Sequence, residues 1–127
     1  MLNDGKVTAN IPAADLNRAR TFYADKLGLT PSAEIEAALV LVYTTAGETT
    51  FTIYETQFAG LAGHTIAQWH VDDIEAEVRD LQAKGITFEQ YDMPGMTRTG
   101  ELHVAMGTRA AWFKDPDGNI LAIVNGG

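Results

Sequence analysis

The sequence predicts an α+β fold of two tandem βαβββ modules, which form a curved, barrel-like mixed sheet around a groove. Residues 14–31 and 72–89 resemble each other, and in both the apolar side chains recur at three- and four-residue steps, as on one face of a helix. Each segment also follows one strand-like run and precedes three more. One half alone is too small to bury a sheet face, so the two halves are expected to pair around a shared groove.

The two predicted helices have recognisable ends. Asp15 in the first segment and Asp72 or Asp73 in the second suit the N-cap, where a carboxylate accepts a hydrogen bond from a free backbone N–H. Gly28 and Gly85 suit the residue just past a helix end, where the backbone often becomes left-handed. These signals place one helix in each half.

Strand-like runs flank both helices. They cover residues 6–12, 33–37, 38–44 and 49–56 in the first half, and 64–71, 86–91, 109–113 and 119–124 in the second. The turn KDPDGN joins the last two runs, because Pro116 presets φ and Gly118 supplies a positive φ. The modules are therefore expected at about residues 6–57 and 64–125 of a single domain, 1–127.

Composition limits the class of partner. The chain has 127 residues, a net charge of −8 and no cysteine, so disulfides and thiolate metal sites are excluded. Nucleic acid is not an expected partner, because its phosphates require clustered Lys and Arg. No stretch looks like a bilayer span or a secretory signal, so no membrane association and a cytoplasmic location are expected. The acidic balance would suit a cationic ligand.

Two motifs resemble a known family. The first is DLxRAxxFYxxxLGL at residues 15–29, and the second is FKDPDGNILAIV at residues 113–124. With the repeated module, they resemble the vicinal oxygen chelate superfamily, which includes glyoxalase I, bleomycin-resistance proteins, fosfomycin-resistance enzymes and extradiol dioxygenases. The resemblance extends from about Lys6 to Asn125. Since short members are commonly dimers, it implies a C2 homodimer whose modules pair within or between chains.

The resemblance also implies where a divalent ion would bind. Members that use a metal carry His or Gln on the first strand, Glu on the fourth, His on the fifth and Glu on the eighth. The corresponding positions are Thr8, Ile66 and Ala122 on the first, fifth and eighth strands, with Tyr54 or Glu55 on the fourth. The chain thus resembles a member that lacks the usual ligands, and no cofactor is expected.

A non-standard divalent metal site is the minority alternative. His70 and His103, with either Glu101 or Glu55, could form one, although no spacing in the sequence requires it. A lone histidine is more often a hydrogen-bonded structural or pocket residue than a metal ligand.

Strand alternation predicts which side chains line the groove. If Phe51 and Ile53 pack under a helix, Tyr54 faces the groove and Glu55 points away. The irregular segment 91–108 is expected to act as a lid whose methionines lie near a ligand. The candidate ligand-binding residues are Thr8, Asn10, Thr52, Tyr54, Gln68, His70, Met93, Met96, His103, Trp112 and Ala122.

Three functions fit these residues. The leading one is a metal-independent small-molecule binding protein that sequesters a drug or metabolite, as bleomycin-resistance proteins do. The second is a glyoxalase-like lyase or isomerase, or another enzyme of the superfamily, with a non-standard or metal-free site. In that enzyme His70 or His103 would be the base and Tyr54 the acid or oxyanion donor. The third is an interaction protein whose groove is largely filled.

Overall fold

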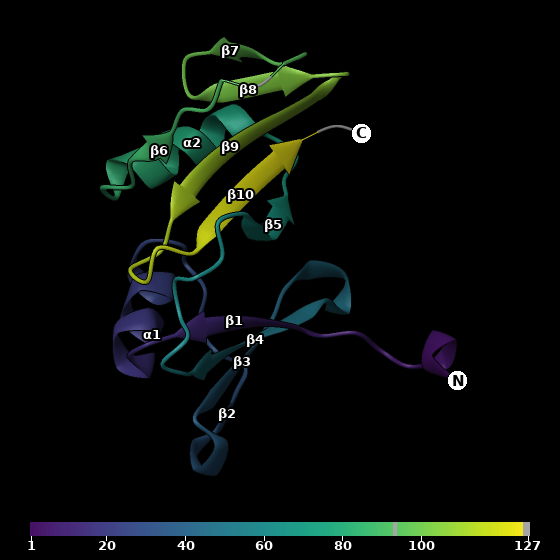
Figure 1. Ribbon diagram of the computed structural model, residues 1–127, viewed down its shortest axis with the longest axis vertical. Helices are drawn as coiled ribbons and strands as arrows, with labels where there is room; N and C mark the ends of the chain where they lie inside the picture. The colour runs from purple at the N-terminus through teal and green to yellow at the C-terminus, as the bar shows by residue number, and fades with distance from the viewer. Residues whose placement is uncertain (93, 126–127) are drawn as a thin grey trace.

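The computed structural model describes residues 1–92 and 94–125, and it contains two sheets, each accompanied by one α-helix (Figure 1). The first half has β1 (Ala9–Ala13), α1 (Leu16–Asp25), β2 (Ala33–Ile35), β3 (Val40–Thr44) and β4 (Thr50–Glu55). The second half has β5 (Thr65–His70), α2 (Ile74–Ala83), β6 (Phe88–Glu89), β7 (Thr97–Thr99), β8 (Leu102–Ala105), β9 (Thr108–Lys114) and β10 (Ile120–Asn125). Short 3₁₀ turns cover Leu2–Asp4, Glu36–Ala38 and Ala46–Glu48.

The two sheets repeat one arrangement. The first has the strand order β1-β4-β3-β2, and the second has the order β5-β10-β9-β8-β7, with β6 paired to β9. In each half the strand before the helix runs parallel to the last strand, so β1 lies beside β4 and β5 lies beside β10. The repeat in the sequence is thus a repeat in the structure, and the predicted α+β fold is confirmed. The sheets are curved and stay open, without closing into a barrel (Figure 1).

Both helices begin and end near the predicted residues. Asp15 and Asp73 each accept a hydrogen bond from the backbone N–H three residues further on, at 3.1 Å in both cases, so Asp73 rather than Asp72 is the second N-cap. Gly28 and Gly85 have φ values of 71° and 93°, which a side chain would make unfavourable. No helix within residues 1–92 and 94–125 has the length and apolar composition needed to cross a bilayer.

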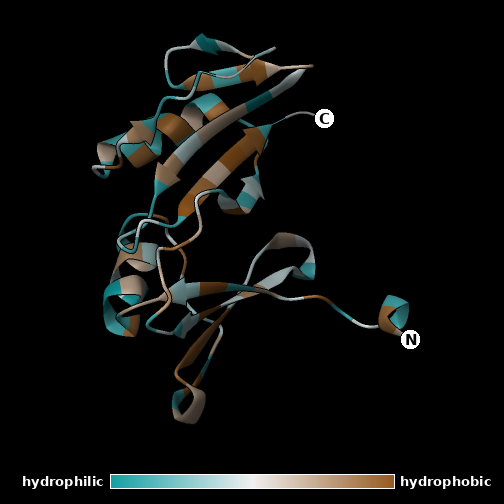
Figure 2. Cartoon of the chain, viewed as in Figure 1, coloured by the Kyte–Doolittle hydropathy of each residue, from teal (hydrophilic) through white to brown (hydrophobic). Residues whose placement is uncertain are grey.

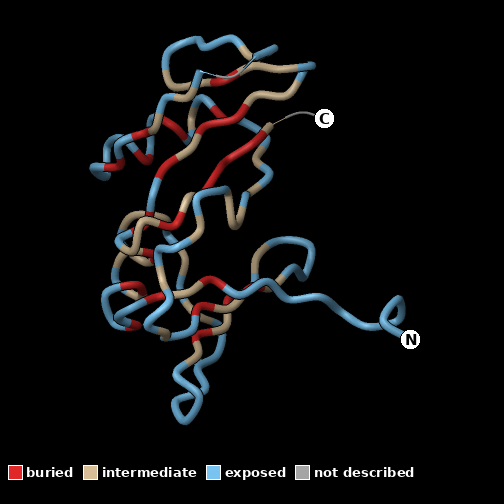
Figure 3. The backbone as a smooth tube through the Cα atoms, viewed as in Figure 1, coloured by how far each residue is buried: buried red, intermediate tan, exposed pale blue. Residues whose placement is uncertain are grey.

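The helix-bearing faces of both sheets pack into one hydrophobic core (Figure 3). On β4 Phe51 and Ile53 are buried in this core, while Thr52 and Tyr54 alternate toward the opposite face, as predicted. Trp69 of β5 also packs against it. Because the core lies on the helix side of each sheet, each sheet keeps a second face of its own, and the predicted site residues are divided between these two faces.

Residues 91–108 differ from the predicted irregular lid. β7 and β8 form an antiparallel hairpin around Gly100 and Glu101, and β8 pairs with β9 across Met106 and Gly107. Gly100, Met106 and Gly107 have positive φ values of 62°, 49° and 79°, as tight hairpin turns require. Residues 97–108 therefore extend the second sheet. Gly100 and Gly107, each within a few residues of Thr or Val on both sides, are the signal that predicts such turns.

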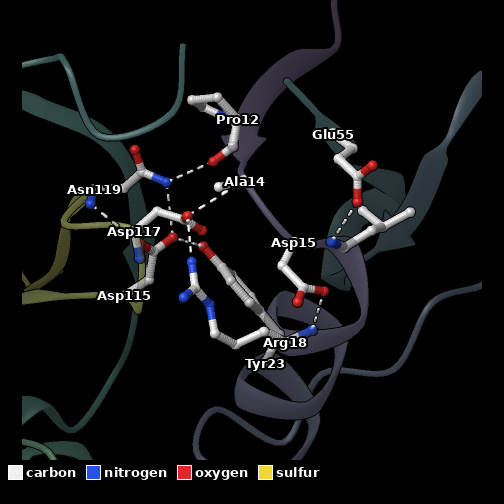
Figure 4. Close-up of polar contacts among 10 residues, drawn as sticks. Pro12, Ala14, Asp15, Arg18, Tyr23, Glu55, Asp115, Asp117 and Asn119 are labelled. Atoms are coloured by element: carbon white, nitrogen blue, oxygen red, sulfur yellow. Dashed lines mark hydrogen bonds and ion pairs between the residues drawn. The ribbon is translucent and has the colours of Figure 1, made fainter. Parts of the chain in front are cut away.

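A buried polar network joins the turn between β9 and β10 to the first half of the chain (Figure 4). The Tyr23 hydroxyl donates to Asp115 Oδ2 at 2.9 Å. The Asn119 side-chain amide donates to the same carboxylate at 2.9 Å and to the Pro12 carbonyl at 2.8 Å. Asp117 Oδ1 accepts from a backbone N–H just before α1 and from a guanidinium on α1, at 3.0 and 2.7 Å. The KDPDGN motif is thus a structural connection between the two halves.

The same network perturbs two titratable groups. Burial raises the pKa of Asp115, although hydrogen bonds from Asn119 and Tyr23 oppose the rise. Burial also raises the pKa of Tyr23, and the charge of Asp115 adds to that rise. Both shifts mean that the folded chain holds these two protons more tightly than the unfolded chain does.

Candidate functional site

The open face of the second sheet contains a cavity of about 380 Å³. Five predicted site residues lie together in its wall, namely Gln68 and His70 on β5, Met96 before β7, His103 on β8 and Trp112 on β9. They converge because alternate residues of neighbouring strands share one face. The remaining lining residues are Ala105, Thr108, Ala110 and Val124. The candidate list contains none of these four, although Thr108 and Ala110 alternate in phase with Trp112.

The centre of this face is apolar. Ala110, Ala122 and Val124 are buried together, with Trp112 packed against them. Ala122 pairs with Gln68 on one side and with Trp112 on the other. Figure 2 shows the same property, because β10 is hydrophobic along most of its length, as expected for a strand with both faces covered. Ala122 therefore belongs to the buried layer of this face, beside the lining residues.

His103 is 1% exposed, and its hydrogen bonds define its chemistry. Its Nε2 accepts from the backbone N–H of Tyr91 at 2.9 Å. A neutral imidazole that accepts at one nitrogen carries its proton on the other, so Nδ1 is a donor. Nδ1 is buried and has no hydrogen-bond partner among the described residues. With its lone pair used by Tyr91, His103 can form a further hydrogen bond only as a donor, through Nδ1.

Trp112 stands between two hollows of the sheet face. Its ring meets the His103 ring edge to face, with centroids 4.8 Å apart and planes at 82°, and its indole N–H donates to Thr65 Oγ1 at 2.9 Å. Trp112 also lines a second hollow of about 410 Å³. The lining of that hollow is Gly63, His64, Thr65, Tyr91, Asp92, Trp112 and Ile120. Because Trp112 borders both hollows, a ligand larger than the first could extend past its ring.

The candidate residues of the first half lie on a different sheet. Thr8 is exposed and precedes β1, and its hydroxyl oxygen lies 3.3 Å from that of Thr50. The Thr52 hydroxyl donates to the Asn10 side-chain carbonyl, and Tyr54 is 37% exposed. The first strand was predicted over residues 6–12, but β1 begins only at Ala9, after Thr8. Met93, the last candidate, lies outside the described residues.

The positions at which the resemblance places metal ligands do not fit a divalent ion. Thr8, Ile66 and Ala122 offer one hydroxyl and two aliphatic side chains, whereas such ions require imidazole and carboxylate donors. Glu55 is engaged elsewhere, since its Oε1 accepts from the N–H of Leu16 at the start of α1, at 3.0 Å (Figure 4).

The alternative metal site built on two histidines has a further difficulty. A ligating imidazole needs a free lone pair, and the Nε2 lone pair of His103 is used by the Tyr91 amide. Within residues 1–92 and 94–125, no three His, Asp or Glu side chains gather into a group that could hold an ion.

The candidate catalytic residues are separated in the same way. His70 is exposed and lines the cavity, so its imidazole could meet a ligand. His103 lines it too, but the Tyr91 amide occupies the lone pair that a general base needs. Tyr54 lies on the other sheet, so within one chain it is not part of this cavity wall. His70 is therefore the candidate base that fits the geometry.

Comparison with known proteins places this geometry in a family. Among solved structures, the antibiotic-binding protein TnmS3 from Streptomyces sp. CB03234 has a TM-score of 0.70 at 19% identity, with 98% of each chain covered. A bleomycin-binding protein complexed with bleomycin has a TM-score of 0.70 at 20% identity, covering 97% of this chain and 99% of that one. The fosfomycin resistance protein FosX from Listeria monocytogenes has a TM-score of 0.69 at 13% identity, covering 98% and 94%.

At these identities the structural likeness shows the fold alone. A comparison with curated proteins found no match. The family model described as Glyoxalase/Bleomycin resistance protein/Dioxygenase superfamily matches residues 7–123, which include both helices, every strand except the end of β10, and every lining residue of the cavity except Val124. The chain therefore belongs to the glyoxalase/bleomycin resistance protein/dioxygenase superfamily.

Proposed function

We propose that this chain is a small-molecule binding protein that holds its ligand, without a metal ion, in the cavity lined by His70, His103 and Trp112. The observation that carries the proposal is the composition of the cavity, whose apolar base is joined by a few converging polar groups. Its volume of about 380 Å³ lies within the range of about 300–1,000 Å³ usual for such sites. Relatives of this fold named for binding an antibiotic or bleomycin support a sequestering role.

A ligand screen with matched variants tests the location of the site. Thr108 lines the cavity, and Thr108→Trp would obstruct it, whereas Thr99 lies on the exposed strand β7 and Thr99→Trp would leave it open. Ligands that raise the Tm of the parent are expected to raise that of Thr99→Trp and to lose their effect on Thr108→Trp. A ligand at 100 times its Kd stabilises the folded state by about 2.7 kcal/mol. Ligands that stabilise both variants equally would refute this location.

Metal independence rests on the donor chemistry at Thr8, Ile66 and Ala122. Calorimetric titration of chelator-treated protein with Ni²⁺, Zn²⁺, Mn²⁺ and Fe²⁺ is expected to show no stoichiometric binding. The shifts in Tm caused by screen ligands are expected to persist in the presence of chelator. One tightly bound ion per chain would refute this part of the proposal.

The proposal includes a homodimer in which the first sheet of one chain covers the cavity of the other. The open face of the first sheet carries Asn10, Thr52 and Tyr54 together with the half-buried Val40 and Val42, a composition suited to a partly apolar contact. In such a dimer the candidate residues of both halves would meet in one groove. The residues divided between two faces of a single chain would then form one site across the interface.

Light scattering at micromolar concentration tests the dimer. Tyr54→Glu places a charge on the proposed interface and is expected to give a monomer, whereas Gln82→Glu adds the same charge on an exposed position of α2 and is expected to leave a dimer. A monomeric parent protein, or a Tyr54→Glu variant that remains dimeric, would contradict the arrangement.

A metal-free enzyme is the second candidate, and His70 is the observation that favours it, because it is an exposed imidazole at the cavity wall. Mass spectrometry of screen ligands after prolonged incubation separates the two functions. A sequestering protein returns each ligand unchanged, whereas an enzyme would convert one, and His70→Ala would then abolish conversion while binding persists.

A further inference from the structure

Four features of the cavity wall together define a ligand class more narrowly than the proposed function does. The first is the Nδ1–H of His103, a buried donor with no partner among residues 1–92 and 94–125. The proton lies on Nδ1 because Nε2 accepts a hydrogen bond from the Tyr91 backbone N–H at 2.9 Å. A buried donor without a partner is unfavourable, so an acceptor atom on a bound ligand would supply a hydrogen bond that the free protein lacks.

The second feature is the absence of carboxylates, ammonium groups and guanidinium groups among the described residues that line the cavity. The cavity is lined by Gln68, His70, Met96, His103, Ala105, Thr108, Ala110, Trp112 and Val124, a set without Asp, Glu, Lys or Arg. Several carboxylates of this acidic chain are instead paired with arginines, as Glu75 is with Arg109 at 2.8 Å. An ionic ligand would lose its hydration here without meeting an opposite charge. The lining therefore does not support the cationic ligand that the net charge of −8 suggested.

The third and fourth features concern shape. The small side chains of Ala110 and Ala122 are buried at the centre of this face. The Trp112 ring packs beside these alanines. A hydrogen bond to Thr65 and edge-to-face contacts with His103 and Tyr91 hold the ring in place. A rigid indole beside an apolar surface favours a flat aromatic partner, which adds stacking to the burial of apolar area.

We propose that the cavity selects uncharged aromatic ligands with a carbonyl-type oxygen, and that His103 Nδ1–H donates to this oxygen while Trp112 packs against the ring. His103 is in this view the specificity-determining residue of the site. The inference rests on the proposed function, since it names the class of ligand for the same cavity.

Three probes of similar size test it in the full-length protein. 1-Indanone carries a ring ketone, and indane is the same bicycle without the oxygen. 2-Aminoindane carries an ammonium group on that bicycle at neutral pH. Binding is followed by NMR of ¹⁵N-labelled protein through the Trp112 indole N–H and the His103 ring nitrogens. 1-Indanone is expected to bind about 3- to 10-fold more tightly than indane, as one net hydrogen bond allows, and 2-aminoindane more weakly than 1-indanone.

The same spectra test the tautomer directly. In the free protein the proton of His103 is expected on Nδ1, and 1-indanone is expected to shift the Nδ1–H resonance more than indane does. A proton on Nε2 would overturn the inference before any ligand is added.

Two substitutions separate the two sides of the imidazole. In His103→Gln the side-chain oxygen can replace Nε2 as acceptor for Tyr91, but no donor remains at the Nδ1 position. In His103→Asn a donor remains near the Nδ1 position, but the acceptor for Tyr91 is lost. The preference for 1-indanone is expected to vanish in His103→Gln and to persist in His103→Asn. Thr99→Trp, on the exposed strand β7 outside the cavity, is the control and is expected to keep the preference.

The outcomes distinguish this inference from the proposed function. If 1-indanone and indane bind the parent equally, or 2-aminoindane binds best, the ligand class is wrong while the cavity remains a binding site. If a ketone preference exists but survives in His103→Gln, another residue provides the donor and the role of His103 is refuted. If neither bicycle perturbs the Trp112 or His103 signals at millimolar concentration, the cavity does not admit aromatic ligands, and the inference fails together with the proposed site.

Discussion

Separate replacement of Tyr23 and Tyr43 by phenylalanine tests whether the buried polar network holds the two halves of the chain together. Both side chains are buried in the same core, with ring centroids 6.0 Å apart. The Tyr23 hydroxyl donates to Asp115, whereas the Tyr43 hydroxyl has no partner within the described part of the chain. Phenylalanine keeps each ring and removes only the hydroxyl, so the two variants differ in hydrogen bonding far more than in packing.

The expected effects have opposite signs. A hydrogen bond to a charged group contributes about 1.5–3 kcal/mol, so Tyr23→Phe is expected to lower the free energy of unfolding by about 2 kcal/mol. Removal of a buried hydroxyl without a partner relieves a desolvation cost, so Tyr43→Phe is expected to raise it by up to about 1 kcal/mol. In a chain of this length each kcal/mol shifts Tm by about 4 °C. The variants are then expected about 8 °C below and up to about 4 °C above the parent.

Scanning calorimetry at pH 7 measures both shifts. The protein concentration must be the same in all samples, because the Tm of an oligomer depends on it. Circular dichroism confirms that each variant folds. A Tyr23→Phe variant at least as stable as Tyr43→Phe would refute the reasoning, since the Asp115 hydrogen bond would then contribute nothing net.

Three further predictions concern the same region. Because burial raises the pKa of Asp115, the folded chain binds that proton more tightly than the unfolded chain; this contribution to stability is present at low pH and is lost as pH rises through the raised pKa. In chemical denaturation at several pH values, the free energy of unfolding of Asp115→Asn should fall less over that window than that of the parent. An equal fall in both proteins would contradict this. Burial raises the pKa of Tyr43 from 10.0 to about 12, so the folded state loses stability as pH rises across this interval. In alkaline denaturation the free energy of unfolding of Tyr43→Phe should therefore fall less than that of the parent. Gly60→Ala would place a Cβ atom 2.3 Å from the Asp117 carbonyl oxygen, whereas at Gly47, also at positive φ, a Cβ meets nothing within 4 Å. Gly60→Ala should be less stable than Gly47→Ala by about 2 kcal/mol or more, and equal stabilities would exclude the clash.

Local sequence patterns predicted the elements of this fold well. The repeat, the N-caps Asp15 and Asp73, and the alternation along β4 all reflect interactions between residues a few positions apart, which spacing alone encodes. The lack of ligating side chains at Ile66 and Ala122 could likewise be read from the sequence, because the resemblance to the superfamily implies where the ligands would stand. The same reasoning failed for residues 91–108, where two tight turns interrupt the strand pattern after very few residues.

The sequence by itself determined the family, the repeated order of elements and the alternation of faces along β4, because these depend on local motifs, periodicity and short-range hydrogen bonds. Only the tertiary structure decided that Tyr91 occupies the His103 lone pair, that Tyr23 reaches Asp115, and that the candidate residues divide between two sheets. These contacts join side chains far apart along the chain, and their partners are chosen by packing and burial. No spacing rule encodes such a choice. For that reason the chemistry proposed for the cavity could be argued only from the folded molecule.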